Sequence, residues 1–347
     1  MPEHVTILGD GAMATVCSIL LTQGGHTVTM WGAFEDSIER LIQNREQARL
    51  LPGVRIPSGV ALTANDASCF DGATMVLSAV PTQYMRGVWT RLAEYLPKGV
   101  PVVSVAKGIE TSTLLCPTQI ISSVLKDAGF GIAQEGGTRL AALSGPNIAA
   151  ELARYLPATA VVASEDEPLA ERVQAAFSTQ WFRVYTNTDV IGVELGGAIK
   201  NVIAIAAGIL DGLSAGNNAK AALVTRGLVE ITRLGVAMGA RPDTFQGLAG
   251  IGDLITTCVS PEGRNRTVGE RIGKGMELSR ILASMEGVAE GVPTTKAVIT
   301  LARQNHVEMP ITEAVYRVLF EDKDVLHALS DLMTRDPKPE RLQPRQP

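Results

Sequence analysis

The strongest constraint on the fold lies at the N-terminus, where a short apolar run is followed at once by a glycine-rich turn and a helical segment. Val5–Leu8 has the pattern of a buried strand, and Gly9-Asp-Gly11-Ala-Met-Ala14 follows it. Strand, Gly-x-Gly-x-x-Ala and helix in this order form the dinucleotide-binding fingerprint. In this fingerprint Gly9 permits the tight turn, Gly11 lets the backbone approach a pyrophosphate, and Ala14 allows close helix packing. Because the N–H groups at a helix N-terminus favour anions, the sequence predicts dinucleotide binding here.

The same alternation of apolar runs and helical patterns continues as far as Tyr185. Near-continuous apolar strands between helices are typical of a parallel sheet covered on both faces. From Asp189 onward the patterns are helical. We therefore expect an α/β chain with a doubly wound sheet domain in residues 1–188, an all-helical domain in 189–335, and a Pro-rich, disordered tail in 336–347. The further predicted strands are Thr27–Trp31, Val60–Thr63, Thr74–Val80, Val102–Val105, Ala141–Leu143, Thr159–Val162 and Phe182–Tyr185.

Composition excludes several classes of protein. The 347 residues are 46% hydrophobic with a net charge of -5, which argues against a general nucleic-acid or membrane-surface binder. The four cysteines and four histidines show no metal-ligand spacing, so we expect a reduced compartment and no metal. The N-terminus lacks a secretion signal, and Glu194, Lys200 and Asp211 interrupt the most apolar segment, so we expect no membrane span and a cytoplasmic protein.

Lys200 is the first catalytic candidate. It lies beside Asn201 within the apolar, small-residue run Leu195–Leu210. Burying a lysine costs several kcal/mol unless the ammonium is paired, so a lysine in such a run has a partner or a chemical role. The alternative is that Lys200 extends from the helix edge to water while its stem covers apolar surface.

Four other positions have polar groups in turns that suit a ligand. Lys107 follows a strand, Asn147 lies in the turn after another strand, and Asp253 follows a glycine-flexible turn. Arg264-Asn265 offers a guanidinium fork and an amide side by side, which suits a phosphate. From the residues alone, plainer interpretations stay open: a solvated loop lysine, an N-cap for Asn147, and a solvated turn for Arg264.

Six motifs in fixed order resemble those of the NAD(P)-dependent glycerol-3-phosphate dehydrogenase family. The resemblance spans Val5 to Arg335 and implies a Rossmann-like domain joined to an all-helical substrate domain. It implies reversible reduction of dihydroxyacetone phosphate to sn-glycerol 3-phosphate for phospholipid synthesis, with NAD or NADP as the cofactor. It also implies a cytoplasmic homodimer without nucleic-acid partners or stable membrane insertion. The motifs are Gly9–Ala14, Lys107-Gly108, Ser144–Pro146, Glu194–Val202, Gly252–Leu254 and Gly263–Asn265.

The resemblance also implies roles for individual residues. Lys200 would be the general acid/base, Lys107 would help to hold the substrate, and Asp253 would lie beside them as a third catalytic residue. The substrate would be lined by Lys107, Gly145, Asn147, Lys200, Asn201, Asp253, Thr257, Gly263, Arg264 and Asn265, with the last two at its phosphate end. The cofactor would contact Gly9, Gly11, Ala12, Met13, Ala14, Lys107, Ala149, Arg264, Val288 and Glu290.

Two departures from the family pattern concern the cofactor. Bacterial members usually have Ser-Trp-Gly where this chain has Ala12-Met13-Ala14, and the basic residue often found after the second strand is absent. Gly32, Ala33 and Phe34 follow that strand, with two carboxylates next, so we expect no local cation for a 2′-phosphate and use of NADH at least as good as NADPH. The alternatives for function are another reductase of a small keto or 3-hydroxy acid, or a non-catalytic nucleotide-sensing protein.

Overall fold

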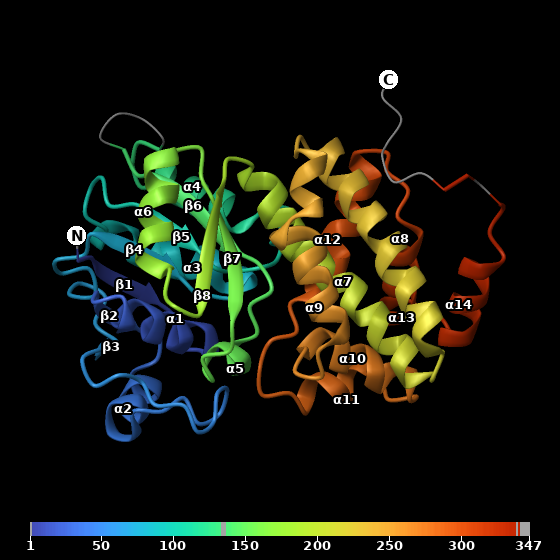
Figure 1. The fold of residues 1–347 in the computed structure, drawn as a ribbon, viewed down its shortest axis with the longest axis horizontal. Helices are drawn as coiled ribbons and strands as arrows, with labels where there is room; N and C mark the ends of the chain where they lie inside the picture. Colours follow the sequence, from blue (N-terminus) through green and yellow to red (C-terminus); the bar gives the residue numbers. More distant parts are fainter. Residues whose placement is uncertain (1, 133–136, 338, 341–347) are drawn as a thin grey trace. The chain divides into compact units, whose positions relative to one another are not determined.

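The computed structural model describes residues 2–132, 137–337 and 339–340, and the chain forms two compact units (Figure 1). The sheet unit comprises Met1–Ala106 and Cys116–Val190, and the helical unit comprises Lys107–Leu115 and Ile191–Pro347. The expected domains 1–188 and 189–335 differ from this division chiefly at Lys107–Leu115, which groups with the helices. Residues 338 and 341–347 of the expected disordered tail lie outside the described residues.

In the described residues eight strands form one sheet in the order β3-β2-β1-β4-β5-β6-β7-β8, which has the central crossover typical of a doubly wound sheet. Val5 of β1 pairs with Val28 of β2, and helices cover both faces, with α1 and α6 on one and α3 and α4 on the other (Figure 1). The strands are β1 His4–Leu8, β2 Thr27–Trp31, β3 Ala61–Thr63, β4 Met75–Ser78, β5 Val102–Ser104, β6 Leu140–Ser144, β7 Ala158–Ala163 and β8 Phe182–Asn187. The helices of this unit are α1 Ala12–Gln23, α2 Glu35–Asn44, α3 Thr82–Leu92, α4 Pro117–Asp127, α5 Ala149–Leu152 and α6 Glu167–Phe177.

One strand pair corrects the expectation of an all-parallel sheet. β6 and β7 are antiparallel, with Leu143 opposite Val162. The connection between them contains only α5, a helix of 4 residues. Such a helix is about 6 Å long, which is too short to return the chain along the sheet, so β7 starts at the end where β6 finishes.

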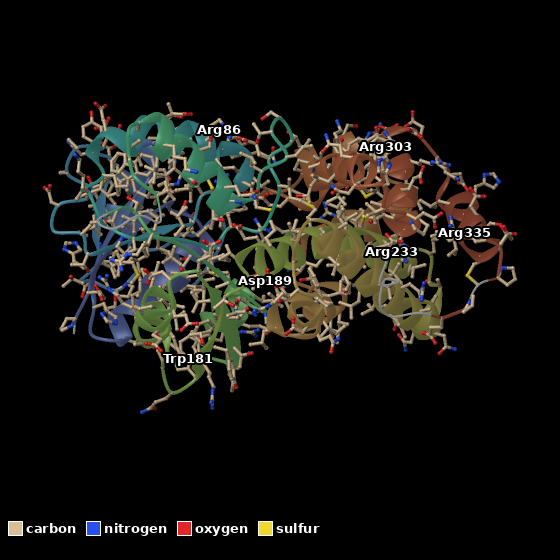
Figure 2. All side chains as sticks on the ribbon, turned by 90° about the horizontal axis from the view of Figure 1, so that it is seen from above. Arg86, Trp181, Asp189, Arg233, Arg303 and Arg335 are labelled. Atoms are coloured by element: carbon tan, nitrogen blue, oxygen red, sulfur yellow. The ribbon has the colours of Figure 1, made fainter. Side chains whose placement is uncertain are left out.

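The helical unit is built around α7, Val190–Gly212, which is buried at every residue from Gly192 to Leu210. By length and composition α7 could cross a membrane, contrary to expectation, but 89% of its most apolar window is buried inside the protein. A helix that is apolar all round is typical of a core. Charged side chains such as Arg303 and Arg335 lie on the outside of this unit (Figure 2). The other helices are α8 Gly216–Ala237, α9 Asp253–Val259, α10 Arg264–Gly273, α11 Leu278–Ala283, α12 Gly291–Gln304, α13 Pro310–Phe320 and α14 Val325–Met333.

Glycines on α7 let other backbones approach it closely. A Cβ atom on Gly208 would lie 2.0 Å from the backbone oxygen of Arg266, and one on Gly212 would lie 2.4 Å from that of Glu270. The approach is mutual, because a Cβ on Gly269 of α10 would lie 1.9 Å from the backbone oxygen of Ile205. α7 and α10 therefore cross backbone against backbone, with no room for a side chain at the crossing.

Candidate active site

Asp253 directly follows an irregular turn that packs on α7. The π-helical turn η3, Leu248–Gly252, is kinked at Gly250, whose φ is −95° and ψ is −105°. A Cβ atom on Gly196 of α7 would lie 2.6 Å from the backbone oxygen of Ala249, so only glycine lets this turn approach α7. Asp253 begins α9 directly after the turn and is 2% exposed. π-helical turns are found often at functional sites, and this one brings the Asp253 carboxylate to 2.7 Å from the Nζ of Lys200.

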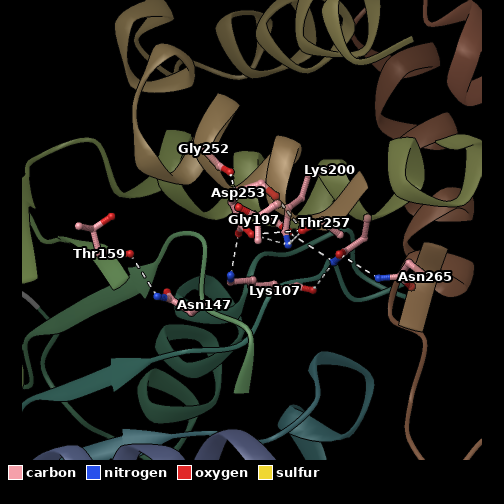
Figure 3. Close-up of polar contacts among 11 residues, drawn as sticks. Lys107, Asn147, Thr159, Gly197, Lys200, Gly252, Asp253, Thr257 and Asn265 are labelled. Atoms are coloured by element: carbon pink, nitrogen blue, oxygen red, sulfur yellow. Dashed lines mark hydrogen bonds and ion pairs between the residues drawn. The ribbon is translucent and has the colours of Figure 1, made fainter. Parts of the chain in front are cut away.

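Lys107 and Lys200 both donate to the carboxylate of Asp253 (Figure 3). The Nζ of Lys107 lies 2.6 Å from Oδ2, and the Nζ of Lys200 lies 2.7 Å from Oδ1. The Nζ of Lys200 also donates to the Oγ1 of Thr257 at 2.5 Å, while the Thr257 hydroxyl donates to the backbone oxygen of Asp253 at 2.7 Å. The Lys200 ammonium is thus held at two points, with one buried carboxylate shared between two cations.

The surroundings of Lys200 lower its pKa from 10.5 to about 8. Burial is the main cause because it disfavours the charged form, and the charge of Lys107 acts in the same direction. The Asp253 carboxylate opposes both effects. The balance, which sequence could not provide, leaves an ammonium that is charged near neutral pH and can still release its proton under mild conditions.

A row of amide hydrogen bonds joins four segments of the helical unit beside this cluster. Asn201 donates from Nδ2 to the backbone oxygen of Lys107 at 3.3 Å, and its Oδ1 accepts from the Nδ2 of Asn265 at 2.9 Å. The Oδ1 of Asn265 accepts from the backbone N–H of Gly291 at 2.9 Å. Asn201 and Asn265 are buried, so these bonds orient both amides and leave the second Nδ2 proton of Asn265 as a donor for a ligand.

Arg264 starts α10 directly after its N-cap residue, Gly263. The Arg264 side chain is exposed, and among the described residues no hydrogen bond or ion pair holds its guanidinium. The charge of Glu290, the N-cap of α12, acts on this guanidinium and favours its protonated form. An accessible guanidinium at a helix N-terminus, next to an oriented amide, is suited to binding an anion.

The glycine fingerprint in the sheet unit has the geometry that a dinucleotide requires. Gly9 has a φ of +120°, and a Cβ atom there would lie 2.8 Å from the backbone oxygen of Ala79. A Cβ on Gly11 would meet only Leu50 at 3.7 Å, so packing alone does not require glycine at this position. The missing side chain instead leaves the N-terminus of α1 open, where no side chain caps the helix and Ala12 and Met13 are partly accessible. These residues fit a pyrophosphate.

The turn after β6 contains Gly145, Asn147 and Ala149. Gly145 has a φ of +137°, and Asn147 donates from Nδ2 to the backbone oxygen of Thr159 at 3.2 Å (Figure 3). The N-cap of α5 is Ile148, so the N-cap interpretation of Asn147 is wrong. Asn147 instead ties the turn to β7.

The end of β2 holds a cation that the sequence did not predict. Arg91 of α3 donates from Nη1 to the backbone oxygen of Ala33 at 3.2 Å and lies over the Trp31 ring. The expectation of no local cation is therefore wrong. However, Arg91 also pairs with Asp66 through Nε at 2.5 Å and Nη2 at 2.7 Å, so its charge is already compensated. Nothing near Ala33 in the sequence could identify an arginine that is 58 residues away.

The expected site residues thus fall into two sets. Hydrogen bonds and ion pairs join one set into a cluster in the helical unit: Lys107, Lys200, Asn201, Asp253, Thr257 and Asn265. Gly263, Arg264, Val288 and Glu290 lie in the same unit, at or near the starts of α10 and α12. The sheet unit holds Gly9, Gly11, Ala12, Met13, Ala14, Gly145, Asn147 and Ala149.

Comparison with known proteins identifies the family. Residues 4–170 match the model of the NAD-dependent glycerol-3-phosphate dehydrogenase N-terminus, and residues 189–330 match that of the C-terminus. A glycerol-3-phosphate dehydrogenase [NAD(P)+] from Citrifermentans bemidjiense is 48% identical over 340 residues, which cover 98% of this chain and 99% of that protein.

Two solved structures agree with this match. A glycerol-3-phosphate dehydrogenase from Coxiella burnetii has a TM-score of 0.90 at 33% identity, covering 96% of this chain and 99% of that one. One from Saccharomyces cerevisiae has a TM-score of 0.79 at 25% identity, covering 96% and 100%. The chain therefore belongs to the NAD-dependent glycerol-3-phosphate dehydrogenase family.

Proposed function

We propose that this protein catalyses the reversible reduction of dihydroxyacetone phosphate to sn-glycerol 3-phosphate, a precursor of phospholipids, with Lys200 as the general acid/base. The observation that carries the proposal is the buried Lys200 ammonium, held by Asp253 and Thr257 with its pKa lowered to about 8. The comparisons give no support to a reductase of another small acid or to a non-catalytic nucleotide sensor.

The residues of the helical unit account for the chemistry. The nicotinamide cofactor, when bound, supplies the hydride that reaches the ketone carbon. The carbonyl oxygen then takes up negative charge, and the Nζ of Lys200 donates the proton that completes the alcohol. In the reverse direction the unprotonated amine accepts that proton. Lys107 helps to hold the substrate oxygen, and Asp253 keeps both ammonium groups in place.

In this proposal Arg264 and Asn265 bind the substrate phosphate, and the glycine fingerprint Gly9–Ala14 binds the cofactor. The accessible guanidinium of Arg264 and the free Nδ2 proton of Asn265 would meet the phosphate at the start of α10. Thr257, Gly263, Gly145 and Asn147 complete the proposed substrate contacts. Gly9, Gly11, Ala12, Met13 and Ala14 would receive the pyrophosphate, with Lys107, Ala149, Arg264, Val288 and Glu290 as further cofactor contacts.

The deciding experiment compares two ketones. Purified protein should oxidise NADH or NADPH with dihydroxyacetone phosphate and much more slowly with unphosphorylated dihydroxyacetone. Arg264→Ala should raise KM for the phosphorylated ketone by about tenfold or more, since a hydrogen bond to a charged group contributes about 1.5–3 kcal/mol. Arg303→Ala, an exposed arginine in the same unit, is the control. Equal rates on both ketones, or an unchanged KM in Arg264→Ala, would remove the phosphate argument.

The pKa of Lys200 predicts opposite pH dependences for the two directions. Reduction needs the protonated amine, so its kcat should be level below about pH 8 and fall as pH rises through the Lys200 pKa of about 8. Oxidation of sn-glycerol 3-phosphate needs the unprotonated amine, so its kcat should rise across the same range. Steady-state rates measured from pH 6 to pH 10 (about two units either side) test this. Parallel profiles in the two directions would contradict the assignment of Lys200.

We propose that the protein uses NADH at least as well as NADPH. Each arginine that could reach the end of β2 already has a partner. Arg91 is bound to Asp66, and Arg40 pairs with Asp36 at 2.9 Å. Arg45 donates to the backbone oxygen of Val60 at 3.0 Å. Ala33→Arg should add an uncommitted cation and improve kcat/KM for NADPH more than for NADH. A wild-type preference for NADPH of about tenfold, or about 1.4 kcal/mol, would contradict the proposal and point to Arg91 leaving Asp66.

We further propose a cytoplasmic homodimer, on the strength of the family resemblance. Light scattering on the purified protein measures its mass directly. A monomer at micromolar concentration would contradict the proposed homodimer.

A further inference from the structure

Arg266 is the third residue of α10 and takes no part in the candidate site. It donates from Nε to the Oδ2 of Asp211 at 2.7 Å, and Asp211 lies in the last turn of α7. The other carboxylate oxygen of Asp211 pairs with Lys220 of α8. The three side chains are between 15% and 19% exposed, so the cluster is partly protected from solvent. An ion pair with this protection is screened less by salt than an exposed pair.

The crossing of α7 and α10 explains why such a tie is needed. The two backbones meet at Gly208 and Gly212 on one side and at Gly269 and Gly273 on the other. Glycines allow a close approach but supply no side chains to interlock. The crossing therefore sets the distance between the helices, and because it has no room for a side chain it also opposes rotation of α10 at Gly269 and Gly273. Both of these glycines lie beyond the first turn of α10, so polar ties are needed to hold the side chains of that turn.

Two consecutive residues of α10 provide these ties at well-separated points of α7. The Nδ2 of Asn265 donates to Asn201, and the Nε of Arg266 pairs with Asp211. Asn201 and Asp211 are about 15 Å apart along the helix axis, at 1.5 Å per residue. The backbone of Arg266 lies over Gly208, between the two points. The side chains of Asn265 and Arg266 therefore reach in opposite directions along α7, which fixes the first turn of α10 against both rotation and sliding.

We propose that Arg266 is a positioning residue for phosphate recognition, acting through Arg264 and Asn265. No described group holds the guanidinium of Arg264, so the first turn of α10 decides where that guanidinium lies. Without the Arg266–Asp211 pair, the side-chain contacts between that turn and α7 in the described part of the chain reduce to the Asn265–Asn201 hydrogen bond. The inference rests on the proposed function, because it assigns to Arg264 and Asn265 the phosphate of the substrate.

The first test is Arg266→Met, which keeps the apolar stem and removes the charge. We expect KM for dihydroxyacetone phosphate to rise by at least about fivefold while kcat stays within about twofold, a split that a loss of folded protein would not produce. The rate with unphosphorylated dihydroxyacetone should not change. The matched control is Arg271→Met on the same helix, where the arginine donates to Ser284 instead of α7. Unchanged KM in Arg266→Met would overturn the inference.

A double variant tests whether Arg266 acts through Arg264. Residues that act as one unit have non-additive effects, so Arg264→Ala/Arg266→Met should raise KM by clearly less than the product of the two single effects, with the remaining increase acting through Asn265. Fully additive effects would overturn the inference. If Arg266→Met does not fold, Asp211→Asn removes the same pair and should give the same split between KM and kcat. An inactive wild-type protein would instead reject the proposed function itself.

Discussion

Lys200→Met is expected to lower kcat for the reduction of dihydroxyacetone phosphate by at least about 10²-fold, because a positioned general acid contributes about 10²–10⁴ in rate. NADH affinity should change little, since the glycine fingerprint belongs to the sheet unit and Lys200 to the helical unit. Stability should not fall, because methionine fills the space of the lysine and Asp253 keeps its pair with Lys107 at 2.6 Å.

Stopped-flow single turnovers and NADH titration by fluorescence separate these effects. Lys274→Met, an exposed lysine paired with Glu270 in the same unit, is the matched control and should have wild-type kcat. A Lys200→Met variant that keeps more than about a tenth of wild-type kcat would reject Lys200 as the general acid, because the minimum contribution of such a group is about 10².

Asp253→Asn should produce the largest loss of stability. Asp253 is 2% exposed and compensates two ammonium groups whose side chains are 17% and 7% exposed. Removing one partner of a buried ion pair costs about 3–5 kcal/mol of unfolding free energy, because the remaining charge is left without compensation. Here two cations would remain near each other, so we expect a value in the upper part of that range, measured by urea denaturation.

The same substitution should also change the pH profile. The Asp253 carboxylate raises the pKa of Lys200 against the effect of burial, so its loss should lower that pKa further below about 8. Reduction by Asp253→Asn should therefore be slow at neutral pH and recover partly as pH falls. Asp243→Asn, with a side chain 76% exposed, is the control for both measurements. A stable variant with the wild-type pH profile would show that the carboxylate does not govern Lys200.

Local pattern predicted the parts of the fold in which sequence neighbours determine structure. The eight apolar runs correspond to the eight strands, because burial on both faces of a sheet requires continuous apolar segments. The pattern did not reveal the antiparallel pairing of β6 and β7, since the direction of a strand depends on its connection and not on its composition.

For the candidate site, sequence predicted residue types but not their partners. Lys200 could be singled out because an ammonium in an apolar run needs compensation. Its two partners lie 53 and 57 residues further along the chain and reach it only because Gly196 admits the η3 turn. The Arg91–Asp66 pair and the Arg266–Asp211 pair depend equally on packing between distant segments, and a pattern of neighbouring residues carries no signal for either.

The grouping of Lys107–Leu115 with the helices has a consequence for any attempt to divide the protein. The chain enters the helical unit, returns to the sheet unit, and enters the helical unit again at Ile191. A single cleavage near residue 190 would leave Lys107 on the N-terminal fragment and Asp253 on the C-terminal fragment. Neither fragment would then contain both lysines and the carboxylate that they share. Exchange of whole C-terminal halves between relatives would therefore pair a lysine from one parent with a carboxylate from the other. The activity of such hybrids should depend on which parent supplies the 107–115 segment as well as on the position of the junction.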